Sequence, residues 1–357
     1  MNTKLVEAIA NAVLYEGYLL YPYRPSSVKN RQRFNFGVLY PPSYSEAQSG
    51  SDACSMQTEC LAEGSGLTAV EIRIRFLRLV KRSVRKVVTP AVQAGEPPDF
   101  EDVAKLEVEG QTFQSWQEAV EVEVAVPMCN LESLSSCPLE WPFKFPAEEE
   151  SEPLGDAVGN VVGLVAKKQN TITGSVQIGA ELVADGVFKV QVQVENLTSL
   201  DDNREITARD SNREEALMRS LVSAHTLLGI VDGEFVSLLD PPGDFRDFVS
   251  NCRNIGTWPV LVGDEGQHDT MLSSPIILYD YPQIAPESPG DLFDGTEIDE
   301  TLALRIMTMT DEEKREMRQS DDRARRILER TETMPMERMM KLHGTVRELR
   351  SLKPEMS

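Results

Sequence analysis

Apolar and polar residues alternate along residues 69–80, where Val70, Ile72 and Ile74 are separated by charged residues. Since successive side chains of a strand point to opposite faces, this pattern predicts a strand with one buried face. No helical period separates the later alternating runs, and Asp185-Gly186 is a strong hairpin signal. The pattern therefore predicts an antiparallel β-sandwich or barrel-like domain over residues 67–200. The later runs occupy residues 104–109, 119–127, 174–183 and 187–196.

After residue 200 the pattern becomes mixed. Asn212, followed by glutamates and then an apolar stripe, predicts a helix that ends at Gly229. Short apolar runs flanked by Pro and Gly predict brief strands near residues 233–239, 258–262 and 274–278. A mixed α/β domain is therefore expected over residues 201–300. The acidic run at residues 147–156 is expected to be a solvated loop.

Both ends of the chain show helical spacing. Leu5, Ile9 and Val13 predict a first helix that ends by residue 21. Thr310-Asp-Glu-Glu is a capping-box pattern, and helices are expected over residues 298–309, 311–330 and 334–352. Eight of the 13 methionines follow residue 300, which suits either a packed helical tail or an adaptable apolar surface.

The predicted fold class is α+β, and the predicted segments differ in composition. The N-terminal helix and a tyrosine-rich loop precede the antiparallel β domain, and the mixed domain is followed by a helical, charged, Met-rich tail. Their boundaries fall at residues 1–66, 67–200, 201–300 and 301–357.

Charge narrows the choice of partner. The chain has 357 residues, with 36 Lys and Arg against 58 Asp and Glu, and a net charge of −22. This charge repels nucleic acid and anionic lipid, so we expect a protein partner or a small molecule and neither nucleic acid nor membrane. Glu7, Glu16 and Gly17 interrupt the first apolar run, which therefore does not resemble a signal peptide. Five cysteines, an odd number, then favour reduced thiols in the cytoplasm.

Candidate chemistry is sparse. The sequence has no phosphate loop, dinucleotide fingerprint, nucleophile elbow or His-Glu-x-x-His helix, so we assign no catalytic residue and expect no cofactor. Cys60, His225 and His268 are weak candidates for metal binding or chemistry. Each also has a structural interpretation: Cys60 as a buried thiol, His225 as a core histidine on a helix, and His268 as part of a solvated acidic turn.

Two segments combine aromatic side chains, charges and stiff backbone, which are typical of a binding surface. Residues 15–44 hold six of the eight tyrosines, and prolines stiffen residues 279–296. We expect the two segments to meet and form one recognition site, with Arg24 free to pair with a carboxylate of the second segment or of a partner. The alternative is that each covers a different edge of the core. The predicted binding residues are Tyr18, Tyr21, Tyr23, Arg24, Lys29, Tyr279, Asp280, Tyr281 and Glu287.

A basic stripe stands out in this acidic chain. Seven cations lie within fourteen residues between Arg73 and Lys86, and alternation places Arg73 and Arg75 on one outward face. The stripe suits docking of an acidic partner, but it equally suits neutralising glutamates of its own sheet.

Two motifs carry a resemblance to a known family. They are Ala12-Val-Leu-Tyr-Glu-Gly-Tyr-Leu-Leu-Tyr-Pro-Tyr-Arg with Phe36-Gly37, and Ser273-Ser-Pro-Ile-Ile-Leu-Tyr-Asp-Tyr-Pro with Asp294-Gly-Thr-Glu-Ile-Asp. The chain resembles an uncharacterised bacterial protein family associated with gene clusters for uptake NiFe hydrogenases. The resemblance implies a non-catalytic accessory or assembly protein that binds a hydrogenase subunit or a maturation factor. The alternative is a metal carrier or an enzyme that uses His225 and Cys60.

Overall fold

The computed structural model describes residues 3–24, 27, 30, 33–89, 98–200, 209–284, 290, 292, 299–320, 322–339 and 342. The described helices are α1 (Thr3–Leu14), α2 (Pro42–Ala47), α3 (Leu131–Ser136), α4 (Arg209–Leu217), α5 (Arg246–Ser250), α6 (Asp299–Met307), α7 (Asp311–Ser320), α8 (Asp322–Glu332) and α9 (Met336–Met339). The described strands are β1 (Ser55–Thr89), β2 (Asp99–Val103), β3 (Lys105–Val108), β4 (Gln111–Gln114), β5 (Trp116–Asn130), β6 (Leu139–Phe145), β7 (Glu148–Gly155), β8 (Val161–Gln169), β9 (Ile172–Ala184), β10 (Val187–Asn196), β11 (Val222–Phe235), β12 (Trp258–Leu261) and β13 (Thr270–Ser274). The predicted α+β class is confirmed.

One antiparallel sheet organises the molecule. Within the described ranges it has eleven strands, and β3 and β4 form a separate hairpin. Its main path runs β12-β13-β11-β1-β10-β9-β6, while β2, β5 and β8 also pair with β1. β11 to β13 follow residue 200 in the chain, so the sheet continues across the boundary expected there.

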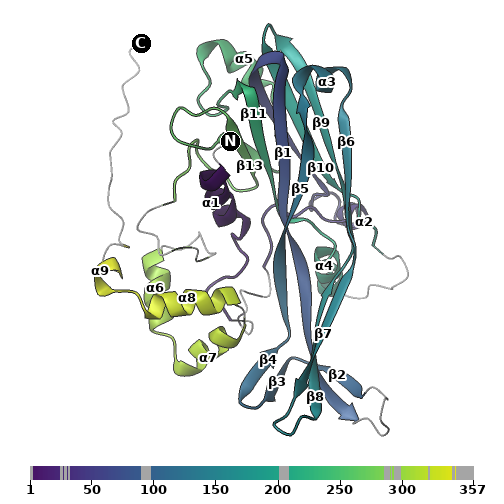
Figure 1. The fold of residues 1–357 in the computed structure, drawn as a ribbon, viewed down its shortest axis with the longest axis vertical. Helices are drawn as coiled ribbons and strands as arrows, with labels where there is room; N and C mark the ends of the chain where they lie inside the picture. The colour runs from purple at the N-terminus through teal and green to yellow at the C-terminus, as the bar shows by residue number, and fades with distance from the viewer. Residues whose placement is uncertain are drawn as a thin grey trace.

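Strand β1 is far longer than the segment that alternation predicts, and it begins within the N-terminal segment expected over residues 1–66. Its first part pairs with β10, its middle lies between β11 and β5, and its last part pairs with β8 and β2. Figure 1 shows it extending down to the tip formed by β2, β3, β4 and β8. The pairing register with β11 shifts between Gly64 and Ala69. This irregularity allows one strand to serve both parts of the sheet.

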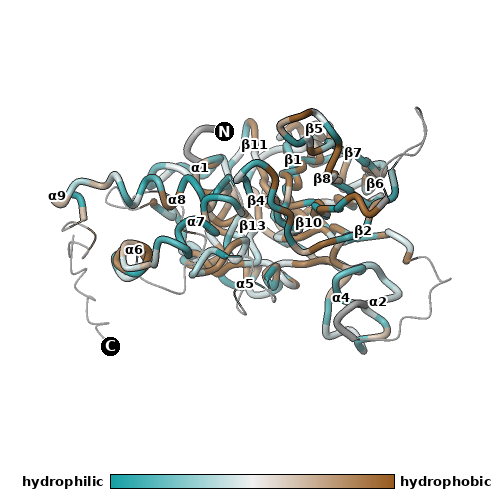
Figure 2. The backbone as a smooth tube through the Cα atoms, turned by 90° about the horizontal axis from the view of Figure 1, so that it is seen from below, coloured by the Kyte–Doolittle hydropathy of each residue, from teal (hydrophilic) through white to brown (hydrophobic). Residues whose placement is uncertain are grey.

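The main core lies between two parts of this sheet. One hydrophobic cluster combines Ile74 of β1, Val124 of β5 and Leu228 of β11 with Ile178 of β9 and Val192 of β10. Figure 2 shows that hydrophobic segments gather in the strands, whereas α7 is mainly hydrophilic. A smaller cluster at the tip holds side chains of β1, β3, β7 and β8. The strands thus enclose a main core and a small distal one.

Three predictions of local structure are wrong. The strand expected near residues 274–278 lies earlier in the chain, since β13 ends at Ser274. Residues 148–155 are not a solvated loop but the strand β7, whose Glu149 and Glu150 lie opposite Lys168 and Lys167 of β8. The helix expected from Asn212 to Gly229 ends at Leu217, and residues 222–235 form β11. Most of β11 is buried on both faces, and a continuous apolar run of this kind has no period that separates strand from helix.

The helical predictions at the two ends fare better. α1 packs Val6, Ile9 and Ala10 against the strands β11, β12 and β13. The capping box is confirmed, since the Thr310 backbone N–H donates to Glu313 and α7 begins at Asp311. Of the helix expected over residues 334–352, the structure describes α9, and most of the remainder lies outside the described residues. None of the helices in the described ranges is long and apolar enough to cross a membrane.

Candidate functional site

The tyrosine-rich segment is an internal interface. Tyr18 and Tyr23 are fully buried, and Tyr21 is half-buried, in a cluster that also holds side chains of α6, α7 and α8. The Tyr23 hydroxyl donates to the Leu292 carbonyl at 2.7 Å. The predicted binding residues Tyr18 and Tyr23 therefore lie in the interior, where they hold the C-terminal helices. Lys29 lies outside the described residues.

Arginines fill the gaps between these aromatic rings. The Cζ atom of Arg33 lies 3.7 Å from the centre of the Trp116 ring, and its terminal nitrogens donate to the carbonyls of Tyr18 and Gln117. Arg323 of α8 lies over the Tyr15 ring at 4.2 Å. Cation–π contacts of this kind are strong when water is excluded, so they fix α8 against the N-terminal segment.

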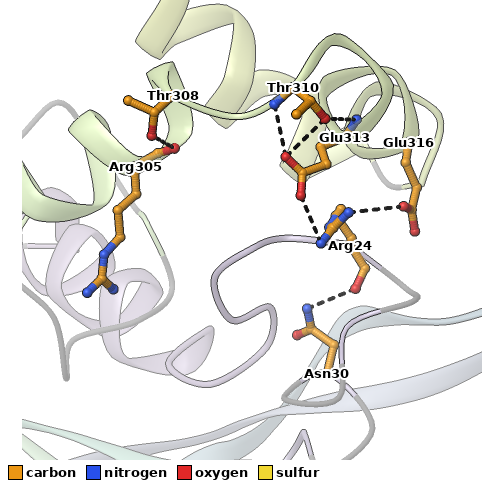
Figure 3. A network of polar contacts seen from close by, with 7 residues as sticks. All are labelled: Arg24, Asn30, Arg305, Thr308, Thr310, Glu313 and Glu316. Carbon is orange, nitrogen blue, oxygen red and sulfur yellow. Dashed lines mark hydrogen bonds and ion pairs between the residues drawn. The ribbon is translucent and has the colours of Figure 1, made fainter.

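Arg24 faces the helix α7 (Figure 3). Its guanidinium pairs with Glu313 at 3.1 Å and with Glu316 at 3.7 Å. The Asn30 side-chain amide donates to the Arg24 carbonyl and holds the backbone beside it. Arg24 thus pairs within the chain rather than with Asp280, and Glu287 lies outside the described residues.

The segment 279–281 is bound to the free side of β12. Asp280 accepts hydrogen bonds from the Leu261 backbone N–H at 2.8 Å and from the Ser237 hydroxyl at 2.5 Å. The backbone N–H of Tyr281 donates to the Leu261 carbonyl. Asp280 is therefore an anchor of the segment, while the neighbouring Tyr279 is 86% exposed.

Large apolar side chains line this edge of the sheet. The chain leaves β13 at Ser274, opposite Trp258, and is bound again to Leu261 at residues 280–281, so the intervening residues run along β12. Trp258, Ile277 and Tyr279 are 45%, 72% and 86% exposed. We call these three side chains the β12 edge surface. The sequence singled out Tyr279 but not Trp258 or Ile277, because exposure of an apolar residue has no signature in one sequence.

Gly37 of the tyrosine-rich segment approaches Pro275, which lies four residues before the segment 279–296. A Cβ atom added to Gly37, which has a φ of +53°, would lie 2.4 Å from Cγ of Pro275. The Gly37 carbonyl also accepts a hydrogen bond from the Ala224 backbone N–H. Only glycine allows this close approach, so residues 36–37 help to position the start of the segment that carries the β12 edge surface.

His225 lies on β11 and not on a helix, and it makes a buried pair with Ser274. Its Nδ1 is 2.7 Å from the Ser223 carbonyl, and its Nε2 is 3.2 Å from the Ser274 hydroxyl. Burial lowers the pKa of His225 to about 4, and the charge of Arg75 acts in the same direction. The ring is thus neutral at pH 7, with Nδ1 donating to the carbonyl. The geometry is that of a nucleophile and base, but both side chains are at most 1% exposed.

The other two metal candidates are also held by their surroundings. Cys60 is fully buried, and burial raises the pKa of its thiol, as do the nearby Cys252 and Glu59. The half-buried His268 has Nδ1 3.0 Å from the Phe235 carbonyl. In the described part of the chain, no three His, Cys, Asp or Glu side chains gather as a metal site would require.

No family model matches the chain, and no curated protein matches it. Function must therefore be inferred from the side chains themselves.

The basic stripe is occupied by carboxylates of its own sheet. Arg75 pairs with Glu121 at 3.0 Å, and Arg82 pairs with Glu118 at 3.3 Å, both from β5. Arg78 is 3% exposed. Of the two interpretations of the stripe, neutralisation of glutamates of its own sheet describes these arginines. The remaining ion pairs that the structure describes for these arginines join Arg73 to Glu71 and Glu123, Arg75 to Glu123, Arg78 to Glu148, and Arg85 to Asp102.

Proposed function

We propose that this protein is a cytoplasmic, non-catalytic accessory protein that binds a subunit or a maturation factor of an uptake NiFe hydrogenase. The observation that carries the proposal is the β12 edge surface, where Trp258 of β12 and Ile277 and Tyr279 of the segment that follows β13 are exposed. The redox-enzyme partner rests on the resemblance of the two motifs, one of which contains Ile277 and Tyr279.

The chemistry of this surface suits protein recognition. Tryptophan and tyrosine are enriched among the residues that dominate binding energy at interfaces. The backbone that carries Tyr279 is tied to Leu261 and Ser237, so little conformational entropy is lost when a partner covers it. An apolar partner surface fits best, because Trp258 and Ile277 carry no charge. The hydroxyl of Tyr279 can form a hydrogen bond at the polar edge of such an interface.

The alternative, a metal carrier or an enzyme using His225 and Cys60, receives less support. A reactive thiol needs a low pKa and access to solvent, whereas burial raises the pKa of Cys60. His225 and Ser274 are aligned but enclosed, so a substrate has no path to them without opening of the sheet.

Co-purification tests the proposal. The tagged full-length protein is expressed in a host that carries the hydrogenase gene cluster, and captured proteins are identified by mass spectrometry. A double variant, Ile277→Ala with Tyr279→Ala, is compared with Leu67→Ala and Val158→Ala, two residues with similar exposure elsewhere. We expect a hydrogenase subunit or maturation factor with the wild type and both controls, and at least about ten-fold less with the double variant.

Two results would contradict the proposal. One is recovery of no hydrogenase subunit or maturation factor under mild conditions. The other is undiminished capture by a folded double variant. Metal analysis of the purified protein distinguishes the accessory protein from the alternative, because stoichiometric nickel, iron or zinc would favour a metal carrier.

A further inference from the structure

A cavity of about 300 Å³ lies between α8, β5 and the C-terminal end of α1. Among the described residues, its lining contains three arginines and a single glutamate, although the chain as a whole carries a net charge of −22. The polar lining side chains are Asn11, Tyr15, Glu121, Arg323, Arg326 and Arg330.

The helix places the three arginines on one side. Residues 323, 326 and 330 are spaced by three and four positions, which brings their side chains to one face of a helix with 3.6 residues per turn. Ala324, Leu328 and Thr331 are buried and anchor α8 in the core. Arg325 also lies on α8, but it pairs with Asp322 and does not line the cavity.

Neutral groups among the described residues contact these guanidinium groups. Arg323 lies over the rings of Tyr15 and Tyr18, at 4.2 and 5.1 Å. A terminal nitrogen of Arg330 donates to the Gly290 carbonyl at 3.3 Å. The Nε of Arg326 donates to the Asp322 carbonyl at 3.2 Å, and no carboxylate of the described residues pairs with its terminal nitrogens.

The glutamate in the lining is already engaged. Glu121 accepts a hydrogen bond from Arg75 at 3.0 Å, and it also bonds to the hydroxyl of Tyr15. Burial raises the pKa of Tyr15, so its phenol stays neutral and keeps the proton that it shares with Glu121. The carboxylate is therefore directed toward Arg75 and Tyr15, which leaves the Arg326 side of the cavity positive.

We infer that this cavity binds a small oxyanion, a phosphate or carboxylate group, through Arg326 and its two neighbouring arginines. Guanidinium groups recognise both oxyanions through paired, charge-assisted hydrogen bonds, and the Asn11 amide lies in the same lining. The volume is at the lower end of that of small-molecule sites, which suits a small anion better than a nucleotide. This inference does not rest on the proposed function.

Titration calorimetry on the full-length protein tests it. Inorganic phosphate and citrate are titrated separately, each against sodium chloride of matched ionic strength. The Arg326→Gln variant removes one of the three positive charges that line the cavity, and the Arg325→Gln variant is the matched control at the neighbouring position of the same helix. Both side chains are exposed, so both variants are expected to fold.

We expect saturable binding by the wild type and by Arg325→Gln, with a dissociation constant at least about ten-fold higher for Arg326→Gln. Binding of phosphate alone identifies a phosphate ligand, and binding of citrate alone identifies a carboxylate ligand. The inference is overturned if the wild type binds neither anion saturably, or if the two variants bind equally well.

Discussion

Arginines perform different tasks in the sheet and in the helical layer. On β1 they face carboxylates, as in the pairs Arg75–Glu121 and Arg82–Glu118. In the layer between the N-terminal segment and α8, Arg33 and Arg323 instead face aromatic rings and backbone carbonyls. In a sheet the register alone brings opposite charges together across neighbouring strands, so arginine there mainly neutralises glutamate. Where tyrosines gather, the same side chain fills the space between rings and joins segments that are distant in sequence.

Arg78 offers the most severe test of the sheet. It is 3% exposed and binds Glu148 together with the carbonyls of Pro146 and Asn170. Replacement by Met leaves these acceptors without their donor, and we expect a loss of at least about 3 kcal/mol in the free energy of unfolding. Urea denaturation measures it. Arg85→Met, which removes an exposed pair with Asp102, should cost less than about 1 kcal/mol. Equal losses of stability for Arg78→Met and Arg85→Met would contradict the distinction between the buried and the exposed pair.

His225 predicts a dependence of sheet stability on pH. Its folded-state pKa of about 4 lies below the ordinary value of 6.5, so the unfolded chain binds the proton more readily. The stabilisation is complete above pH 6.5 and is lost as the pH falls toward 4, by up to roughly 3 kcal/mol. Unfolding free energies measured across this range should fall more steeply for the wild type than for His225→Gln. Parallel slopes for the wild type and His225→Gln would refute the assignment.

Arg323 tests the helical layer. Arg323→Gln removes the contacts with the rings of Tyr15 and Tyr18, and we expect a loss of about 1–2 kcal/mol in urea denaturation. Arg325→Gln on the same helix should change stability by less than about 0.5 kcal/mol. Tyr15→Phe, which keeps the ring but removes the hydroxyl, should cost less than Arg323→Gln. A larger cost for Tyr15→Phe would show that hydrogen bonding, not stacking, holds α8.

Arg24 should have the smallest effect, because its pairs with Glu313 and Glu316 are partly exposed to solvent. We expect Arg24→Gln to destabilise the protein less than Arg323→Gln does. The difference from the wild type should shrink as sodium chloride is raised, since salt screens exposed pairs. Thermal unfolding at low and high salt measures this. A difference that is independent of salt would indicate that Arg24 acts through packing.

The sequence predicts the elements whose residues are half-buried, but it misses β11, which is mostly buried on both sides, and β7, which is mostly exposed. Alternation identified β1 over residues 69–80, and the Thr310 pattern identified the start of α7. β11 was mistaken for a helix because Ser223–Ile230 is buried throughout and shows no period. The tyrosine-rich segment was predicted as a binding surface, but its composition could not reveal that α6 to α8 cover Tyr18 and Tyr23. Trp258 and Ser274 gave no signal, since their roles depend on tertiary neighbours.

Strand β1 also determines the order in which the chain can fold. β5 follows it closely in sequence, whereas β11, which pairs with residues 62–77 on the opposite side, ends only at Phe235. The hydrogen-bond partner of Thr58, Ser273, is synthesised later still, since it lies 215 residues further along the chain. During synthesis from the N-terminus, one edge of β1 therefore stays without its native partner while about 150 residues are added. An open edge of this kind can pair with another chain, so the nascent protein is most prone to aggregate in this interval.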